Sequence, residues 1–525
     1  MSQMKTKYPS NLLKYFVFNT SWGQKEGQEH EKLIYYWCNK GGSDGVAMEQ
    51  QISDCGLAEG VINFVSNFGN QNQDQEDIKC QAIHGMRTRI VLDELENDYW
   101  SVMVISVSYS ILKGTQDDEQ IVEYHQDEIN DRFIRLVMRN IYRHFKFLNG
   151  QIDMLWKECN KDRNTFLELC KHFFDSNIPH LKLTPIHLIQ AYSAIQYLPL
   201  DNINFMLTQS FVNHVVCLDC NRIANSMFLY NDQLVCSSLT LNDTKTVYSY
   251  LTTTIIPDVI CEEISGLQQN VKTRWIKKGL KVYLTETNQF YEMNLFRSIN
   301  GATVVLFLTI PKQQNHKVNQ NSNKNDKEIK QETNELRNQE TNELKNQKSN
   351  ELKNQESNEL KNQESNDKNN SESNEDILSK CEALMCSRLV GLTTKLAEIA
   401  IKINGSQNLN CESVPSESFK FVYFNASNRA YKSNISSMFD LRKLSDAEFV
   451  RFVINIESDL STTITEKNIR EIISKTTNDS WLIVHHSDSR TLFSMLNHKN
   501  ANLIEASETV NALTSKQFKN ILFID

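Results

Sequence analysis

The sequence contains no apolar run long enough to cross a lipid bilayer. The longest strongly apolar stretch near its middle is TVVLFLTI at residues 303–310, whereas a spanning helix needs about 18 residues or more. The first thirty residues hold a short apolar stretch that is broken by Lys14 and leads into the polar TSWGQKEGQEHEK, without the small residues typical of a cleavage site. We therefore expect a cytoplasmic chain with no export signal, no transmembrane segment and at most peripheral membrane contact.

An excess of basic residues is also missing. The 56 Lys and Arg are outnumbered by 65 Asp and Glu, which gives a net charge of −9, whereas nucleic-acid-binding domains typically carry a concentrated basic patch. We therefore expect no nucleic-acid partner. The 12 cysteines are scattered singly along 525 residues, unlike the dense cysteines of small disulfide-rich domains, and we expect them to be reduced.

Motifs of common phosphate-binding and metalloprotease sites are likewise absent, because neither GxxxxGKS, GxxxxGKT nor HExxH occurs. Cys217 and Cys220 form a lone CxxC without a second pair at zinc-binding spacing, which does not indicate a metal site. His485 and His486 are adjacent in a predicted strand, where neighbouring side chains point to opposite faces. The glycine-rich GGSDG at residues 41–45 is interpreted as a turn. We expect no catalytic residue, no metal and no cofactor.

A polar tract at residues 313–376 is the most conspicuous feature that is present. It consists almost wholly of Gln, Asn, Glu, Lys, Ser and Thr, and from Gln331 it repeats an octad that begins as QETNELRN. Each octad offers at most one leucine, so the tract cannot build a hydrophobic core. We predict a disordered insertion. The alternative is a transient helix, because Glu and Lys or Arg recur near i, i+3 spacing.

On either side of this tract, β-rich and amphipathic helical segments alternate in three blocks, which indicates a mixed α/β (α+β) fold class. In the second block, Asn231 and Asp232 form a turn between β-rich halves, and we expect the following KTVYSYLTTTIIP to be a helix that Pro257 stops. The β-rich segments include 12–19, 32–38, 99–112, 281–284, 302–310, 419–425 and 480–496, and the helical ones include 54–68, 129–145, 377–403, 447–456 and 506–520.

The helix predicted at residues 54–68 is the candidate interaction surface. Asp54 stands near its start as a possible cap. One side carries an apolar stripe, which is typical of a face packed on the core, and the opposite side is polar with a single charge. The stripe is Leu57, Val61, Phe64, Val65 and Phe68, and the polar side is Glu59, Asn63, Ser66 and Asn67. The polar side is interpreted either as a solvated face or as a partner surface.

Distinctive strings occur along the chain in a recognisable order. They are LLKYFVFNTSWGQKEGQEHEKLIYYW, GLAEGVINF, YWSVMVI, FLYNDQLVCSSL, YSYLTTTIIP, WLIVHHSDSRTLFSMLNHKNANLIE and QFKNILFID. These strings closely resemble the calcium, caffeine and zinc sensitivity (Ccz) vacuolar-fusion proteins. The resemblance spans the whole chain apart from the polar tract, which departs from the family, as does a region at 261–301 that is shorter than usual.

The resemblance implies three longin domains, each a five-stranded antiparallel sheet flanked by helices, with the tract as a disordered low-complexity insertion. We place the first longin domain at residues 8–195, with dimerisation to a Mon protein and GTPase binding. The second occupies 205–405, interrupted by the tract at 313–376, and the third occupies 416–525.

The family implies a subunit of a heterodimeric guanine-nucleotide exchange factor for the late-endosomal Rab GTPase, paired with a tri-longin protein of the monensin sensitivity (Mon) family. Such dimers act in endosome maturation and in vesicle and lysosome fusion. The early-endosomal Rab and phosphatidylinositol 3-phosphate recruit them to endosomal and lysosomal membranes, and in metazoan members a third, regulatory subunit joins through the outer domains.

By analogy with other longin heterodimers, the resemblance also implies that the first helix lies against the GTPase. Glu59, Asn63, Ser66 and Asn67 are the hypothesised contacts. Exchange needs no covalent chemistry, because tighter binding of the nucleotide-free GTPase is sufficient to expel GDP. Two alternatives stay open: a longin subunit of the lysosome-related organelle Rab exchange complex, and a tether or adaptor without exchange activity.

Overall fold

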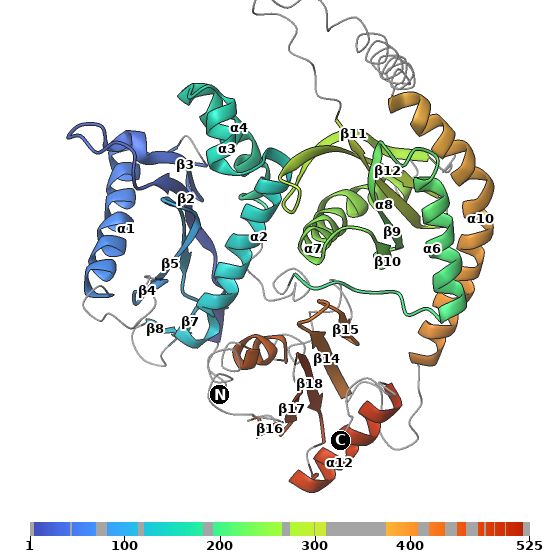
Figure 1. The fold of residues 1–525 in the computed structure, drawn as a ribbon. Helices are drawn as coiled ribbons and strands as arrows, with labels where there is room; N and C mark the ends of the chain where they lie inside the picture. The colour runs from blue at the N-terminus through green and yellow to red at the C-terminus, as the bar shows by residue number, and fades with distance from the viewer. Residues whose placement is uncertain are drawn as a thin grey trace, which may run out of the picture.

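The computed structural model contains three five-stranded sheets and one smaller three-stranded sheet (Figure 1). It describes residues 5–42, 45–69, 81–113, 120–181, 193–264, 274–298, 300–310, 374–407, 419–435, 449–457, 471–476, 479–487, 489–498 and 500–517. The predicted disordered octads lie outside these residues. Among the residues described, no helix is both long and apolar enough to span a membrane.

The first domain is an antiparallel sheet with helices on both faces. Its strands are β2 (Leu12–Asn19), β3 (Leu33–Cys38), β4 (Ala82–His84), β5 (Thr88–Glu96) and β6 (Tyr99–Ser106), in the order β3-β2-β6-β5-β4. The helices are α1 (Met48–Gly69), α2 (Asp131–Asn149), α3 (Ile152–Glu158) and α4 (Arg163–Asn177). Alternation along β2 explains the layers, because Phe16 and Phe18 share a core with α1, whereas Tyr15 and Val17 share one with α2 and α4.

The second domain repeats this arrangement. Strands β9 (Ile223–Tyr230), β10 (Gln233–Ser237), β11 (Arg274–Leu284), β12 (Gln289–Arg297) and β13 (Ala302–Thr309) lie in the order β10-β9-β13-β12-β11. Helices α6 (Asn202–Val216) and α10 (Asn374–Gln407) lie side by side on one face. Helices α7 (Leu241–Tyr250) and α8 (Ile256–Ile264) follow β10 on the other face. The predicted Asn231–Asp232 turn is confirmed, since β9 ends at Tyr230 and β10 begins at Gln233.

The expectation that Pro257 stops the helix after this turn is wrong. Leu251–Ile255 form a π-helical segment between α7 and α8, and Pro257 lies in the first turn of α8. In a regular α-helix the proline ring clashes with the carbonyl four residues earlier. The wider π-helical turn directly before Pro257 relieves this clash, so the chain continues helically through the proline.

The third domain has the same strand order again. Strands β14 (Phe419–Asn425), β15 (Tyr431–Ser433), β16 (Glu471–Lys475), β17 (Trp481–Ser487) and β18 (Arg490–Leu496) are ordered β15-β14-β18-β17-β16. A helical segment at 449–457 covers one face and α12 (Leu503–Gln517) covers the other. In every domain the first strand is therefore flanked by the second and the fifth. The predicted fold class of three antiparallel sheets flanked by helices is confirmed.

Helix α2 is shared by all three domains. It packs on β5 of its own sheet, on β11 and α7 of the second domain, and on segment 449–457 of the third domain. The segment before α6 also joins the domains. In it, Ile195 pairs with Ala430 of the third domain and Tyr197 pairs with Leu234 of the second domain, both as isolated bridges. The domains therefore form one continuous packed body around α2 (Figure 1).

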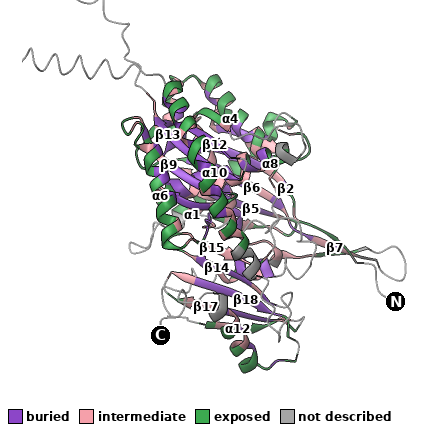
Figure 2. Cartoon of the chain, turned by 90° about the vertical axis from the view of Figure 1, so that its right-hand side faces the viewer, coloured by how far each residue is buried: buried purple, intermediate pink, exposed green. Residues whose placement is uncertain are grey.

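A three-stranded ribbon extends from the first domain (Figure 2). It pairs β1 (Lys5–Tyr8) with β7 (Tyr109–Lys113) and β7 with β8 (Gln120–Tyr124). Tyr8 stacks on Tyr109 with ring centroids 4.8 Å apart. The single β-rich segment expected at 99–112 is therefore two strands: β6 stays in the main sheet, and β7 leaves it after Ser106.

Candidate functional site

Helix α1 begins earlier than the sequence suggested. Because it starts at Met48, Asp54 lies inside the helix and cannot be its cap, so that expectation is wrong. The Asp54 carboxylate instead accepts hydrogen bonds from Lys14 Nζ and from the Tyr36 hydroxyl, both at 2.6 Å. Asp54 therefore fastens α1 to strands β2 and β3.

Two residues of the apolar stripe expected to pack on the core face outward. Leu57 is 57% exposed and Phe64 is 63% exposed, whereas Cys55 and Ala58 are buried against the sheet. The sheet face under α1 already carries Phe16 and other aromatic side chains. Small residues let the helix approach such a bulky face, and Leu57 and Phe64 are left on the surface.

The four polar residues hypothesised to contact the GTPase lie in different environments. Glu59 accepts hydrogen bonds from Lys32 Nζ at 2.7 Å through both carboxylate oxygens, and its side chain is only 17% exposed. Asn63 and Ser66 are exposed, and the Ser66 hydroxyl donates to the Asn63 carbonyl at 3.0 Å. The side chain of Asn67 lies outside the described residues. Only Asn63 and Ser66 are thus placed on an open surface, and the contact hypothesis stays a prediction.

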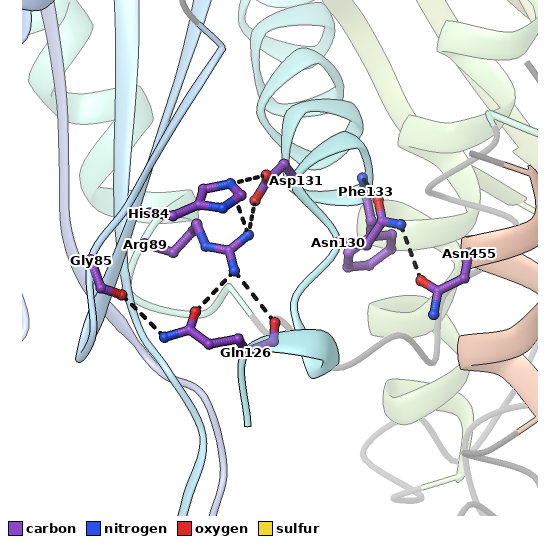
Figure 3. Close-up of polar contacts among 8 residues, drawn as sticks. All are labelled: His84, Gly85, Arg89, Gln126, Asn130, Asp131, Phe133 and Asn455. Atoms are coloured by element: carbon purple, nitrogen blue, oxygen red, sulfur yellow. Dashed lines mark hydrogen bonds and ion pairs between the residues drawn. The ribbon is translucent and has the colours of Figure 1, made fainter. Parts of the chain in front are cut away.

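A cavity of about 730 Å³ at the start of α2 was not anticipated from the sequence. Its walls come from edge strand β4, the turn that follows it, β5, the 3-10 segment Gln126–Glu128 and the first turns of α2 (Figure 3). The lining residues are Gln81, Ala82, His84, Gly85, Met86, Arg89, Gln126, Ile129, Asn130, Asp131, Arg132 and Arg135. They come from separate parts of the chain and share no motif, so the sequence carried no signal for them.

A buried arginine organises one wall of the cavity. Arg89 is 4% exposed and donates to Asp131 Oδ1 at 2.6 Å and to Gln126 Oε1 at 3.1 Å. The second oxygen of Asp131 lies 2.6 Å from His84 Nε2. Gln126 in turn donates to the Gly85 carbonyl at 3.2 Å (Figure 3). This network fixes the β4–β5 turn against the start of α2.

The opposite wall meets the third domain. Asn130 caps α2 by accepting a hydrogen bond from the Phe133 amide at 3.0 Å, and its amide nitrogen donates to Asn455 Oδ1 at 3.1 Å (Figure 3). Arg132 donates to the Glu457 carbonyl at 3.2 Å. The cavity is therefore bordered by the contact between the first and third domains.

The cysteine and histidine pairs singled out in the sequence do not gather ligands in the described part of the chain, where no cluster of three or more His, Cys, Asp or Glu could hold a metal. Cys217 and Cys220 are exposed after α6. His485 lies 3.9 Å from Glu471 across β16 and β17, and burial lowers its pKa. His486 hydrogen-bonds Thr491 at 2.9 Å.

The string GGSDG follows β3 and precedes α1, and its residues Ser43 and Asp44 lie outside the described residues, so its interpretation as a turn stays a prediction. It also fits the GxSxG spacing of α/β-hydrolases. That motif acts at a strand-to-helix turn of an α/β-hydrolase sheet, whereas the sheet here is antiparallel.

Comparison with known proteins defines the class. Profiles described as "First Longin domain of INTU, CCZ1 and HPS4", "Intu longin-like domain 2" and "Intu longin-like domain 3" match residues 12–150, 223–341 and 416–513, respectively. The chain is therefore a protein of three longin domains.

Full-length relatives define the family. The "Vacuolar fusion protein CCZ1 homolog" of Nematostella vectensis is 27% identical over 529 residues, which cover 100% of both chains. The Xenopus laevis homolog is 27% identical over 530 residues, with 99% of this chain and 98% of the relative covered. The Dictyostelium discoideum homolog is 24% identical over 98% of each chain. This chain belongs to the CCZ1 family of vacuolar fusion proteins, and the resemblance noted in its sequence is confirmed.

Proposed function

We propose that this chain is one subunit of a heterodimeric guanine-nucleotide exchange factor for the late-endosomal Rab GTPase, with a Mon-family tri-longin protein as the other subunit. The observation that carries the proposal is the match over the full chain to relatives named vacuolar fusion proteins. The dimer acts in endosome maturation and in vesicle and lysosome fusion. The early-endosomal Rab and phosphatidylinositol 3-phosphate recruit it to endosomal and lysosomal membranes, and in metazoan members of the family a third, regulatory subunit joins through the outer domains.

The outward face of α1 supports the placement of the GTPase. Leu57 and Phe64 form an exposed apolar stripe beside the exposed polar residues Asn63 and Ser66. Apolar side chains that are rimmed by polar ones are typical of protein interaction surfaces. We therefore add Leu57 and Phe64 to the hypothesised contacts, and Glu59 acts through its ion pair with Lys32, which holds α1 in place.

Exchange on this surface needs no bond-making chemistry. A partner that binds the nucleotide-free GTPase more tightly than the GDP-bound form lowers the affinity for GDP by the same factor. The chain is therefore no enzyme in the covalent sense. Its residues contribute shape and differential affinity, and the Mon-family subunit completes the surface.

Release of a fluorescent GDP analogue from the late-endosomal Rab tests the proposal. We expect release to accelerate with the purified dimer and to change little with this chain alone. Replacing both Leu57 and Phe64 by serine should slow release by about tenfold or more, as for interface hot spots. Ile203→Ser is the matched control, because Ile203 is 72% exposed on α6 of the second domain.

Other outcomes of these experiments identify a different function or a different contact surface. A dimer that binds the GTPase without accelerating release identifies a tether or adaptor. Copurification with a subunit of the lysosome-related organelle exchange complex, in place of a Mon protein, identifies that complex. If alanine at Glu59, Asn63, Ser66 and Asn67 leaves release unchanged while Leu57→Ser with Phe64→Ser abolishes it, the polar contact hypothesis is wrong and the apolar one stands.

A further inference from the structure

We propose that two ion pairs set the rotation of helix α1 about its own axis, which makes Asp54 and Glu59 positioning residues for nucleotide exchange. Asp54 pairs with Lys14 of β2. Glu59 pairs with Lys32, which directly precedes β3. The inference rests on the function proposed above, because it concerns how the exposed face of α1 is presented to the GTPase. Neither carboxylate needs to touch the GTPase itself.

Few apolar atoms hold α1 on its sheet. Among the described side chains of this helix, only Gln51, Cys55 and Ala58 are buried, and the partly buried Ile62 packs on the same core. Their spacing places them in one narrow stripe along the helix. Cys55 and Ala58 are small, and stabilisation by burial grows with the apolar area removed from water. Packing alone therefore resists rotation of α1 only weakly.

The two ion pairs lie on opposite sides of this stripe. Each residue of an α-helix advances by about 100° around the axis, which places Asp54 on one side of the stripe and Glu59 on the other. Leu57 and Phe64 then lie on the face away from the sheet, in agreement with their exposure. Rotation of α1 in either direction would pull one of the two carboxylates away from its lysine.

Asp54 is held by two strands at once. Its Oδ2 atom accepts hydrogen bonds from Lys14 Nζ of β2 and from the Tyr36 hydroxyl of β3, both at 2.6 Å. Its Oδ1 atom accepts from Gln50 Nε2 at 3.2 Å. The side chains of Lys14 and Asp54 are 28% and 17% exposed. Both carboxylate oxygens are thus engaged, and the position of Asp54 on the sheet is well defined.

The ion pair of Glu59 is more enclosed. Both of its oxygens accept from Lys32 Nζ at 2.7 Å, and the two side chains are 17% and 12% exposed. Salt screens such a pair less than an exposed one, and removal of one partner leaves an uncompensated charge. The other core of the first domain, which contains α2 and α4, includes no residue of α1. Loss of either lysine should therefore release α1 and leave that core intact.

A native cysteine reports the position of α1. Cys55 is buried in the stripe, and burial, followed by Glu59, raises the pKa of its thiol to about 12. Because the thiolate is the reactive form, iodoacetamide should label Cys55 slowly while α1 is in place. Cys170 of α4 is buried in the other core and reports any wider opening. Mass spectrometry of the labelled full chain distinguishes the two cysteines.

Lys14→Met and Lys32→Met each remove one cation and keep an unbranched side chain. We expect Cys55 to be labelled about tenfold faster, with no change at Cys170, because a charge-assisted hydrogen bond is lost. Lys32 itself lowers the pKa of Cys55, so its removal alone would slow the reaction, and faster labelling must come from movement of α1. Lys157→Met is the matched control, because its ion pair at 2.6 Å is exposed and lies within α3.

Release of the fluorescent GDP analogue, measured with the reconstituted dimer over a range of GTPase concentrations, tests the link to exchange. We expect Lys14→Met to lower kcat/KM by about tenfold and Lys14→Arg to restore it, because a single contact with Asp54 requires a cation on a long side chain. In a chain that already carries Leu57→Ser and Phe64→Ser, Lys14→Met should cause no further loss, since all three changes act through one face. A loss caused by poorer folding would add to theirs.

Two results overturn the inference. If Lys14→Met and Lys32→Met leave Cys55 labelling at the rate of Lys157→Met, the ion pairs do not hold α1. If labelling accelerates but kcat/KM stays the same, the rotation of α1 does not matter for exchange. Failure of the proposed function is distinguishable from both, because the unchanged dimer would then not accelerate release at all, while Cys55 labelling would still respond to the lysine substitutions.

Discussion

A half-buried histidine between the first and second domains makes the stability of the fold depend on pH. His144 of α2 lies with Nε2 3.1 Å from the Ser249 hydroxyl, and its ring meets Tyr250 edge-on at 5.8 Å. Burial, with a smaller contribution from Arg143, lowers its pKa from 6.5 to about 4. In the unfolded chain the imidazole takes up a proton below pH 6.5, whereas the folded protein resists protonation until about pH 4.

The sign and size of the effect follow from this difference. Neutral His144 contributes its stability fully above pH 6.5, and the contribution is lost as the pH falls from 6.5 to about 4. At about 1.4 kcal/mol for each pH unit, the loss reaches up to about 3 kcal/mol. His144→Gln keeps a polar group near Ser249 but does not titrate, so this part of the pH dependence should disappear.

Urea unfolding of the full chain at a series of pH values measures the difference. His214 is exposed on α6, so His214→Gln should follow the unchanged protein at every pH. The reasoning is refuted if His144→Gln loses stability between pH 6.5 and 4 in parallel with the unchanged protein. Hydrogen exchange along α2 and α7 would then locate the group that does titrate.

Substitutions at two further positions test the packing and a helix end. Phe145 is fully buried against Phe173 and Phe174, with ring centroids 5.2 and 5.4 Å away. We expect Phe145→Ala to lower the free energy of unfolding by about 3–5 kcal/mol in urea denaturation at pH 7, and Phe145→Leu to cost clearly less; equal losses would contradict the packing argument. Thr240 caps α7 by accepting from the Asp243 amide at 3.4 Å, so Thr240→Ala should cost about 1 kcal/mol and Thr240→Asn much less. A Thr240→Ala protein with unchanged stability would show that this long hydrogen bond contributes nothing.

Local sequence patterns predicted well those strands and helices whose own residues define them. The β-rich FKFVYFN and ATVVLFLTI became β14 and β13, and the stripe at 377–403 lies within α10. The orientation of α1 could not be read in this way, because it depends on the volume of the aromatic side chains beneath it. Periodicity identifies an apolar face, but it does not say whether small residues on another face, here Cys55 and Ala58, fit the sheet better.

The cavity and the ribbon were missed for a different reason. Arg89 and Arg135 are separated by several elements, and only the packing of α2 across the sheet brings them to one cavity. Likewise, β1 pairs with β7 more than one hundred positions later, as in the register Thr6 to Ile111. Such contacts depend on tertiary geometry, which a single sequence without aligned relatives does not reveal.

The position of the polar tract bears on how its length can change over generations. It enters after β13 and leaves at α10, and both elements are anchored in the core of the second domain, where Leu306 and Leu389 are fully buried. For a flexible connection between two fixed points, each doubling of length adds only about 0.6 kcal/mol to the entropy of closure. For the disordered insertion that the composition of the tract predicts, adding or removing whole octads would therefore change the free energy of folding little.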